Sequence, residues 1–344
     1  MDIVNQKIIQ AIIEKSKKVC PESLVMIGIY GSVATGDTYE KSDLDLLVLV
    51  EDDEGGKLAT GFILDDKKVG YDVYCTSWSG LSYDAECHHA HLSKLMDSQI
   101  VYIKNQEAYD KLCELRARAK RFLQSEEGII RANELIDKAK TSYANACLRE
   151  GLGEVRLNAC EVISYLLDAV MIYHGTYFKR GTKRTFEELA TLPLDEVFVQ
   201  TIQKAVTCKE VFELRDLLKH LILYAESHTR QEKNKAVPSE ALKGTYEEMY
   251  SNWRNKVEEA AKNNNAFASF MNMCSLQFML SEIAQDVEIG SFCVMDEYNT
   301  DSLADNTEIF DRNLQKYEQA YKKAQISVKR FADVDGFVAS YLGQ

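Results

Sequence analysis

The sequence predicts an α+β fold in which a small mixed β-sheet comes first and a bundle of helices follows to the C-terminus. Two patterns carry this prediction. Short apolar segments, partly β-branched, recur up to Ile103 and are typical of strands. After Gln106, nearly every segment repeats its apolar residues at spacings of three and four, which is typical of amphipathic helices. The chain has only 3 prolines, so few of these helices should be interrupted.

The first part of the chain should place one helix before the sheet and another among its strands. Apolar residues at helical spacing cover residues 3–19, and Asp2 is a candidate N-cap for that helix. A second helix is expected over residues 79–96. The expected strands, all in one sheet, are residues 24–30, 43–50, 61–64, 68–76 and 100–103, of which the last is an edge strand.

The second part of the chain should form a helical bundle. Its polar, proline-containing residues 229–238 predict a long loop between helices. The apolar positions within residues 267–279 are expected to pack in the bundle core. A chain of 344 residues is long for one compact domain, so we expect two, residues 1–118 and 119–344. The helices are expected over residues 109–123, 129–149, 155–174, 195–225, 246–261 and 266–285.

Composition excludes several classes of protein. The net charge is −13 and no basic run is long enough to follow a phosphate backbone, which argues against long nucleic acid as a partner. An acidic surface favours a cationic small substrate, although it also serves solubility. The 9 cysteines are scattered without a CxxC pair, as expected for reduced thiols in a cytoplasmic protein. The sequence shows neither a signal peptide nor an apolar run long enough to span a bilayer, so we expect no export and no membrane anchor.

One stretch carries the pattern of a combined metal and phosphate site. Gly31 and Ser32 follow one expected strand, and Asp43 and Asp45 lie on the next, separated by a leucine. Alternate residues of a strand point to the same face, so the two carboxylates should project together. Mg²⁺ takes oxygen ligands and usually sits between carboxylates and substrate phosphates. Gly31 lets the backbone approach a phosphate, and Ser32 can begin a short helix whose N–H groups bind the terminal phosphates.

Asp72 is the natural third carboxylate. It lies in the strand-like segment of residues 69–74, among apolar neighbours. An aspartate in such a stretch is costly unless something neutralises it, and a metal ion at the end of the neighbouring strand would do so. The alternative is an ordinary charge on an edge strand.

These residues resemble the signature of the DNA polymerase β nucleotidyltransferase superfamily, which has a Gly-Ser pair, an Asp-x-Asp strand and a later strand-borne aspartate. The resemblance implies that a nucleoside monophosphate passes from a nucleoside triphosphate, with ATP expected, to an acceptor hydroxyl, while pyrophosphate leaves. It also implies a Mg²⁺ cofactor, with Mn²⁺ as the alternative, and lets Asp72 act as ligand or as general base. The matching residues are Gly31 and Ser32 for the nucleotide, and Asp43, Asp45 and Asp72 for the metal.

The chain departs from the superfamily in one respect. Relatives often carry an arginine where this chain has Val33 or Thr35. The basic residue that contacts the triphosphate is therefore left open.

A weaker resemblance covers residues 173–184, which look like the helical substrate domain of bacterial antibiotic nucleotidyltransferases of the kanamycin and lincosamide type. It implies a small hydroxylated acceptor, with antibiotics among the candidates. In such enzymes an acidic residue of the helical domain can take the proton of the acceptor hydroxyl, and Glu161 is the candidate here. The alternative is a solvent-facing helical glutamate. Transfer to a protein or a tRNA end, as in antitoxin-like relatives, and a binding module without turnover are the other interpretations.

Two further patterns are weaker. His88 and His91 would share a face of the expected helix over residues 79–96, which suggests zinc, but no matching Cys or His pair accompanies them. Arg215 and His220 fit the Arg-x4-His pattern of HEPN ribonucleases. We expect no zinc site at the histidines and ordinary bundle residues at Arg215 and His220, and keep a ribonuclease function of the helical part as an alternative.

Overall fold

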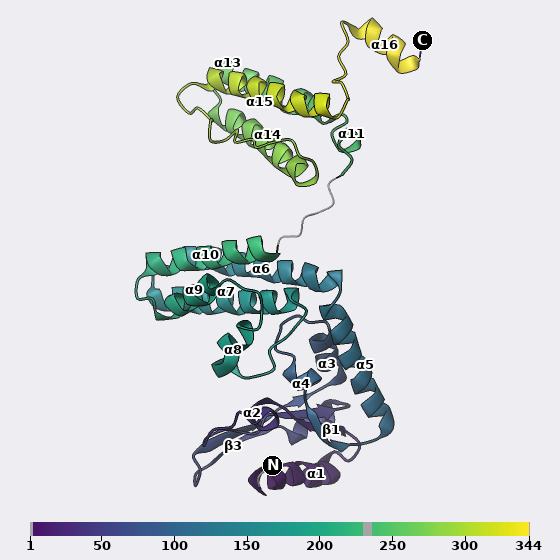
Figure 1. Cartoon of the computed structure of the whole chain (residues 1–344), viewed down its shortest axis with the longest axis vertical. Helices are drawn as coiled ribbons and strands as arrows, with labels where there is room; N and C mark the ends of the chain where they lie inside the picture. The colour runs from purple at the N-terminus through teal and green to yellow at the C-terminus, as the bar shows by residue number, and fades with distance from the viewer. Residues whose placement is uncertain (1–2, 230–235, 344) are drawn as a thin grey trace. The chain divides into compact units, whose positions relative to one another are not determined.

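The computed structural model describes residues 3–229 and 236–343 (Figure 1). The chain divides into two compact units, Met1–Arg230 and Gln231–Gln344. The expected boundary between residues 118 and 119 falls inside helix α5 (Gln106–Leu123). A single hydrophobic core joins the sheet to the helices on both sides of that position, from Val25 in the sheet to Ala225 near the end of the first unit.

A mixed four-stranded sheet lies near the N-terminus, as the sequence predicts. Its strand order is β5-β2-β1-β6, with β1 antiparallel to β2 and β6, and β5 parallel to β2. The last strand is an edge strand, as expected. The strands are β1 (Leu24–Ile29), β2 (Leu46–Val50), β5 (Cys75–Thr76) and β6 (Gln99–Ile103).

Both faces of this sheet are covered, which explains why its two central strands are apolar throughout. Leu46, Val48 and Val50 pack in one core with residues of α1 (Ile3–Val19). Leu47 and Leu49 point the other way, into the core shared with the later helices. The expected helix over residues 3–19 is therefore confirmed, while its candidate cap Asp2 lies outside the described residues.

The expectation of a single sheet is wrong. β3 (Thr60–Leu64) and β4 (Val69–Val73) form a separate two-stranded antiparallel sheet. Within β4, Val69, Tyr71 and Val73 are buried and alternate with exposed residues. The expected strand over residues 68–76 therefore divides between two sheets, at the exposed Tyr74.

The expected helix over residues 79–96 is broken into α3 (Trp78–Ala85) and α4 (Ser93–Met96). Between them the chain is irregular, and Cys87 adopts a positive φ of 51°. Ala90 explains the break: its N–H donates to a carboxylate oxygen of Asp168 at 2.9 Å, and its carbonyl accepts from the backbone of Phe178 at 2.8 Å. The backbone N–H and C=O of Ala90 thus bond to distant segments, so they do not form the hydrogen bonds of a continuous helix.

Helices make up the remainder of the first unit. Three of them, α6, α7 and α10, lie side by side (Figure 1). The single helix expected over residues 195–225 is divided, because Cys208 is extended and its carbonyl accepts a hydrogen bond from Arg156. The elements are α2 (Gly31–Thr35), η1 (Asp53–Leu58), α6 (Glu126–Cys147), α7 (Leu152–Tyr173), η2 (Thr182–Arg184), α8 (Thr185–Leu189), α9 (Glu196–Thr207) and α10 (Val211–Thr229).

The second unit is a helical bundle with its own core. In α14 the buried apolar residues are Met273, Leu276 and Leu280, whereas Phe267 and Phe278 are 75% and 74% exposed, so the apolar stripe expected in the core is largely on the surface. Most of the expected loop over residues 229–238 lies outside the described residues. The helices are α11 (Pro238–Ala241), α12 (Thr245–Met249), the π-helical η3 (Tyr250–Arg254), α13 (Asn255–Lys262), α14 (Ala266–Asp286), α15 (Leu303–Lys323) and α16 (Val334–Leu342).

Among the helices of residues 3–229 and 236–343, none combines the length and the apolar character that crossing a bilayer requires.

Candidate functional site

Gly31 lies at the point where β1 gives way to α2, and only glycine fits there. Its φ is +65°, a region that side-chain-bearing residues rarely adopt. A Cβ on Gly31 would lie 1.9 Å from Oδ2 of Asp45. The backbone N–H of Ser32 donates a hydrogen bond to the same carboxylate. The Gly-Ser pair is therefore fitted around Asp45.

Asp43 and Asp45 precede β2 instead of lying on it, because the strand begins at Leu46. Leu44 is buried between them, while Asp43 is exposed and Asp45 half-buried. Burial and the nearby charge of Asp43 raise the pKa of Asp45, against the opposing effect of the Ser32 hydrogen bond. The two carboxylates are thus close enough to repel each other.

Asp72 reaches the same region from the separate β3–β4 sheet. It is an exposed residue of β4, and together with Asp43 it lines an open hollow of about 590 Å³. Phe62 and Tyr71 form the apolar side of this hollow, with their rings stacked at 5.2 Å between centroids. The hairpin therefore places its carboxylate beside Asp43 even though it belongs to another sheet.

The side chain of Tyr30 lies near several of these carboxylates. Its burial, followed by the charges of Asp45, Asp84, Asp43 and Asp72, raises the pKa of Tyr30 to about 12. All three aspartates predicted from the sequence thus lie near one side chain, as does a fourth, Asp84. No pattern in the sequence singles out Asp84, because it is an isolated acidic residue of α3.

These carboxylates suit a hard divalent cation by their chemistry. Asp43 and Asp45 repel each other, which a cation between them would relieve, and Asp43 shares a hollow with Asp72. Within residues 3–229 and 236–343, no group of three or more His, Cys, Asp or Glu side chains is placed so that it could hold a metal ion. A metal bound to all three aspartates would therefore require one of their side chains to turn.

His88 and His91 do not share a helical face, contrary to expectation, because the segment between α3 and α4 is irregular. Each imidazole instead has its own carboxylate partner: His88 pairs with Glu86 at 3.2 Å, His89 with Asp84 at 3.4 Å and His91 with Asp168 at 3.9 Å. This arrangement argues against the zinc interpretation.

Glu161 is exposed on α7, where it accepts a hydrogen bond from the hydroxyl of Ser142 at 2.9 Å. Its role as general base stays a prediction. Asp168, two turns further along the same helix, is the acidic residue that contacts the segment between α3 and α4, through Ala90 and His91. Burial raises the pKa of Asp168, and the Ala90 hydrogen bond opposes that effect.

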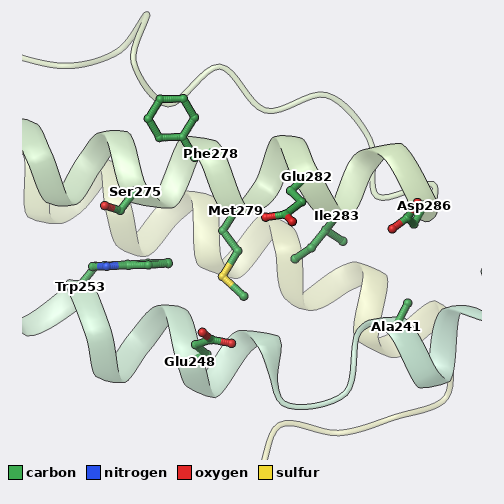
Figure 2. Close-up of a pocket in the computed structure, with 9 residues that line it drawn as sticks. All are labelled: Ala241, Glu248, Trp253, Ser275, Phe278, Met279, Glu282, Ile283 and Asp286. Atoms are coloured by element: carbon green, nitrogen blue, oxygen red, sulfur yellow. The ribbon is translucent and has the colours of Figure 1, made fainter. Parts of the chain in front are cut away.

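The second unit has a hollow of its own, of about 570 Å³ (Figure 2). Trp253 of η3 and Met279 and Ile283 of α14 extend into the space between these helices, with Glu248 and Glu282 among the polar residues that line it. None of the site residues predicted from the sequence lines this hollow.

Comparison with known proteins agrees with the geometry of the first unit. Residues 6–102 match the family described as a nucleotidyltransferase domain. This segment holds Gly31, Ser32 and the four aspartates around Tyr30. Residues 6–102 thus match a nucleotidyltransferase domain, and the protein is an enzyme of the transferase class.

Among solved structures, the chain is similar to the crystal structure of a nucleotidyltransferase-like protein from Exiguobacterium sibiricum 255-15. The two are 13% identical, the match covers 66% of this chain and 76% of that chain, and the TM-score is 0.33. No curated protein matches the chain.

Arg215 and His220, the candidate ribonuclease pair, do not face each other across a site. The guanidinium of Arg215 donates to the carbonyls of Ala146 and Arg149, at the C-terminal end of α6. His220 is 61% exposed and pairs with Asp216 one turn away, at 3.4 Å. Arg215 thus serves as a helix cap.

We expect His220→Ala to change the free energy of unfolding by no more than about 0.5 kcal/mol, because the imidazole is exposed. Arg215→Ala should cost about 1–3 kcal/mol, since it leaves the carbonyls at the end of α6 without their charged donor. Denaturant unfolding of both variants measures this difference. RNA cleavage without added metal that is lost in His220→Ala would instead establish the ribonuclease function.

Proposed function

We propose that this enzyme transfers a nucleoside monophosphate from a nucleoside triphosphate, with ATP the expected donor, to a hydroxyl group of a small acceptor. The observation that carries the proposal is the fit of Gly31 and Ser32 around Asp45. It places the Asp45 carboxylate against Gly31 and the backbone N–H of Ser32, next to a second carboxylate, that of Asp43. That combination suits a phosphate with its counter-ion and has no evident structural purpose.

In the proposed reaction the acceptor oxygen forms a bond to the α-phosphorus, and the bond from that phosphorus to the bridging oxygen of the β-phosphate breaks. Pyrophosphate takes the electron pair and leaves. Asp43, Asp45 and Asp72 would hold Mg²⁺, or Mn²⁺ as the alternative, and the cation would neutralise charge on the phosphates. Ser32 would bind the terminal phosphates, and Gly31 would allow the backbone to approach them.

The proton of the acceptor hydroxyl needs a base, and two carboxylates are candidates. Asp72 lies at the hollow that it shares with Asp43, close to the proposed metal. Glu161 would act from the helical part of the chain, as the resemblance to antibiotic nucleotidyltransferases implies. The proximity of Asp72 to the other aspartates favours it for this role.

A small acceptor, with antibiotics among the candidates, is favoured over a macromolecular one. The net charge of −13 disfavours long nucleic acid and suits a cationic compound. In this proposal residues 1–118 carry the chemistry, residues 119–344 contribute to acceptor binding, and the protein works in the cytoplasm. Nucleotidylation of a protein or of a tRNA end is the alternative function.

The purified protein, incubated with Mg²⁺ and ATP labelled at the α-phosphate, tests the proposal directly. The acceptor panel should include aminoglycosides, lincosamides, tRNA and unrelated proteins. We expect label to pass to a small hydroxylated compound and to depend on Asp45. Label in tRNA or protein alone would select the alternative function, and the lack of any Mg·ATP binding would contradict both.

A further inference from the structure

A basic segment of the first unit is attached to the loop that follows the Gly-Ser pair. Arg180, Lys183 and Arg184 all lie just before α8, and all three contact Asp37. Lys183 donates to the carbonyl of Asp37 at 2.6 Å, and Arg184 donates to its carboxylate at 3.0 Å. Arg180 completes the set, with Nε 3.5 Å from the other carboxylate oxygen. Nearly 150 residues of sequence separate the partners, so tertiary structure alone brings them together.

Asp37 is close to the candidate phosphate site. Helix α2, which begins at Gly31, ends at Thr35, and Gly36 is its left-handed C-cap. Asp37 is the next residue. The basic segment therefore contacts the chain at the residue that follows α2 and its cap, and α2 begins at the Gly-Ser pair.

The charge balance of the site calls for these cations. The four charged side chains that act on Tyr30 are all aspartates, and α2 supplies no positive charge to balance them. A nucleoside triphosphate carries roughly four negative charges near neutral pH, more than one divalent cation neutralises. Residues 180–184 bring three positive charges to the loop after α2, on a protein whose net charge is −13.

The cations are only partly engaged by their present partners. The side chains of Arg180 and Arg184 are 44% and 36% exposed, whereas Asp37 is 17% exposed. The Nε atom of Arg184 is shielded from solvent and has no hydrogen-bond acceptor among the described residues. Glu187 bonds the outer nitrogens of both arginines. The exposed part of each guanidinium can donate to a further oxyanion when that oxyanion displaces Asp37.

We propose that Lys183 and Arg184 bind the terminal phosphates of the nucleotide, and that Asp37 holds these two side chains in position while the nucleotide is absent. The proposal rests on the proposed function and names the basic residues that it needs. Asp37 competes with the phosphates for Arg184, so its carboxylate sets how tightly a triphosphate binds. Lys183 stays attached through the Asp37 carbonyl and keeps the segment at the site.

Binding of Mg·ATP and of inorganic tripolyphosphate, each measured by calorimetry, tests the proposal. Lys183→Gln and Arg184→Gln should each weaken both ligands by about tenfold or more, because each removes a charge-assisted contact. Asp37→Asn should tighten both by several-fold. The matched control is Lys179→Gln, on the same segment, since the Lys179 ammonium lies over the ring of Tyr177 and away from Asp37. It should bind like the wild type.

The double variant Asp37→Asn, Arg184→Gln distinguishes ligand binding from a structural role. It removes both charges of the pair, so neither is left unpaired and folding should be preserved, as thermal unfolding would verify. If Arg184 only holds the loop, the double variant should recover wild-type affinity. If Arg184 binds phosphate, the double variant should stay about tenfold weaker than Asp37→Asn alone.

The outcomes also separate this proposal from the proposed function. Binding of Mg·ATP that is weakened by Asp45→Asn but unaffected by Lys183→Gln and Arg184→Gln would overturn the role of the basic segment alone. Wild-type protein that binds neither Mg·ATP nor tripolyphosphate would overturn both.

Discussion

Asp45→Asn should abolish nucleotidyl transfer, with activity at least about a hundredfold below the wild type, because it removes the charge of a proposed metal ligand while keeping its shape. The fold should remain intact. Asp45 is ringed by Gly31, Ser32 and Asp43, and an asparagine oxygen can still accept the Ser32 hydrogen bond. The measurement is turnover of labelled ATP with the acceptor identified in the screen.

Stability provides an independent check on the same variant. Burial and the charge of Asp43 raise the pKa of Asp45, so ionisation of this carboxyl lowers the stability of the native state relative to the unfolded chain. Asparagine does not ionise, so the free energy of unfolding near neutral pH should be equal to or above that of the wild type. The difference should shrink as the pH falls through the raised pKa of Asp45.

Asp66→Asn is the matched control for this variant, since Asp66 is exposed in the turn between β3 and β4. It should retain full activity. Transfer by Asp45→Asn within about tenfold of the wild type would contradict the assignment of a metal ligand.

Gly31→Ala should lose activity to a similar extent, for a reason that only the structure supplies. The new Cβ would meet the Asp45 carboxylate at 1.9 Å, so the Asp45 side chain must move from its position. A positive φ of 65° adds a conformational cost of about 1–2 kcal/mol, which thermal unfolding should detect. Activity and melting temperature, measured on one preparation, give both effects.

Gly36→Ala separates the two contributions. Gly36 has a similar φ of +76°, but a Cβ there would meet nothing within 4 Å. This variant should lose comparable stability while keeping most of its activity. The double variant Gly31→Ala, Asp45→Asn tests whether Gly31 acts only through Asp45, in which case it should be no less active than Asp45→Asn alone. Additive losses of activity would show that Gly31 contacts the substrate independently.

The parts of the fold that could be predicted are those fixed by neighbouring residues. Apolar spacing located the first helix, the central strands and most later helices, because each pattern repeats within its own segment. The expected helix over residues 79–96 failed where Ala90 bonds to Asp168 and Phe178, partners at least 78 residues away. The expected single sheet failed similarly, because alternation within a strand does not reveal which neighbour the strand pairs with.

The candidate site divides in the same way. Gly31, Ser32, Asp43 and Asp45 lie within fifteen consecutive residues, and a local motif identifies them. Their positions around Tyr30 agree with that motif, although their roles stay predictions. Asp37 could not be connected with Lys183 and Arg184 from the sequence, because their contacts depend on how the helices fold back over the loop after α2.

The continuous core of the first unit has a consequence for how ligands act on it. Buried residues extend without interruption from Val25 and Leu47 in the sheet to Leu221 and Ala225 in α10. Sheet and helices should therefore melt together, in one cooperative transition. A compound that binds only to the helices will then raise the melting temperature of the sheet as well, by the amount that its concentration and affinity dictate. Thermal shift measurements can thus find the acceptor without any turnover.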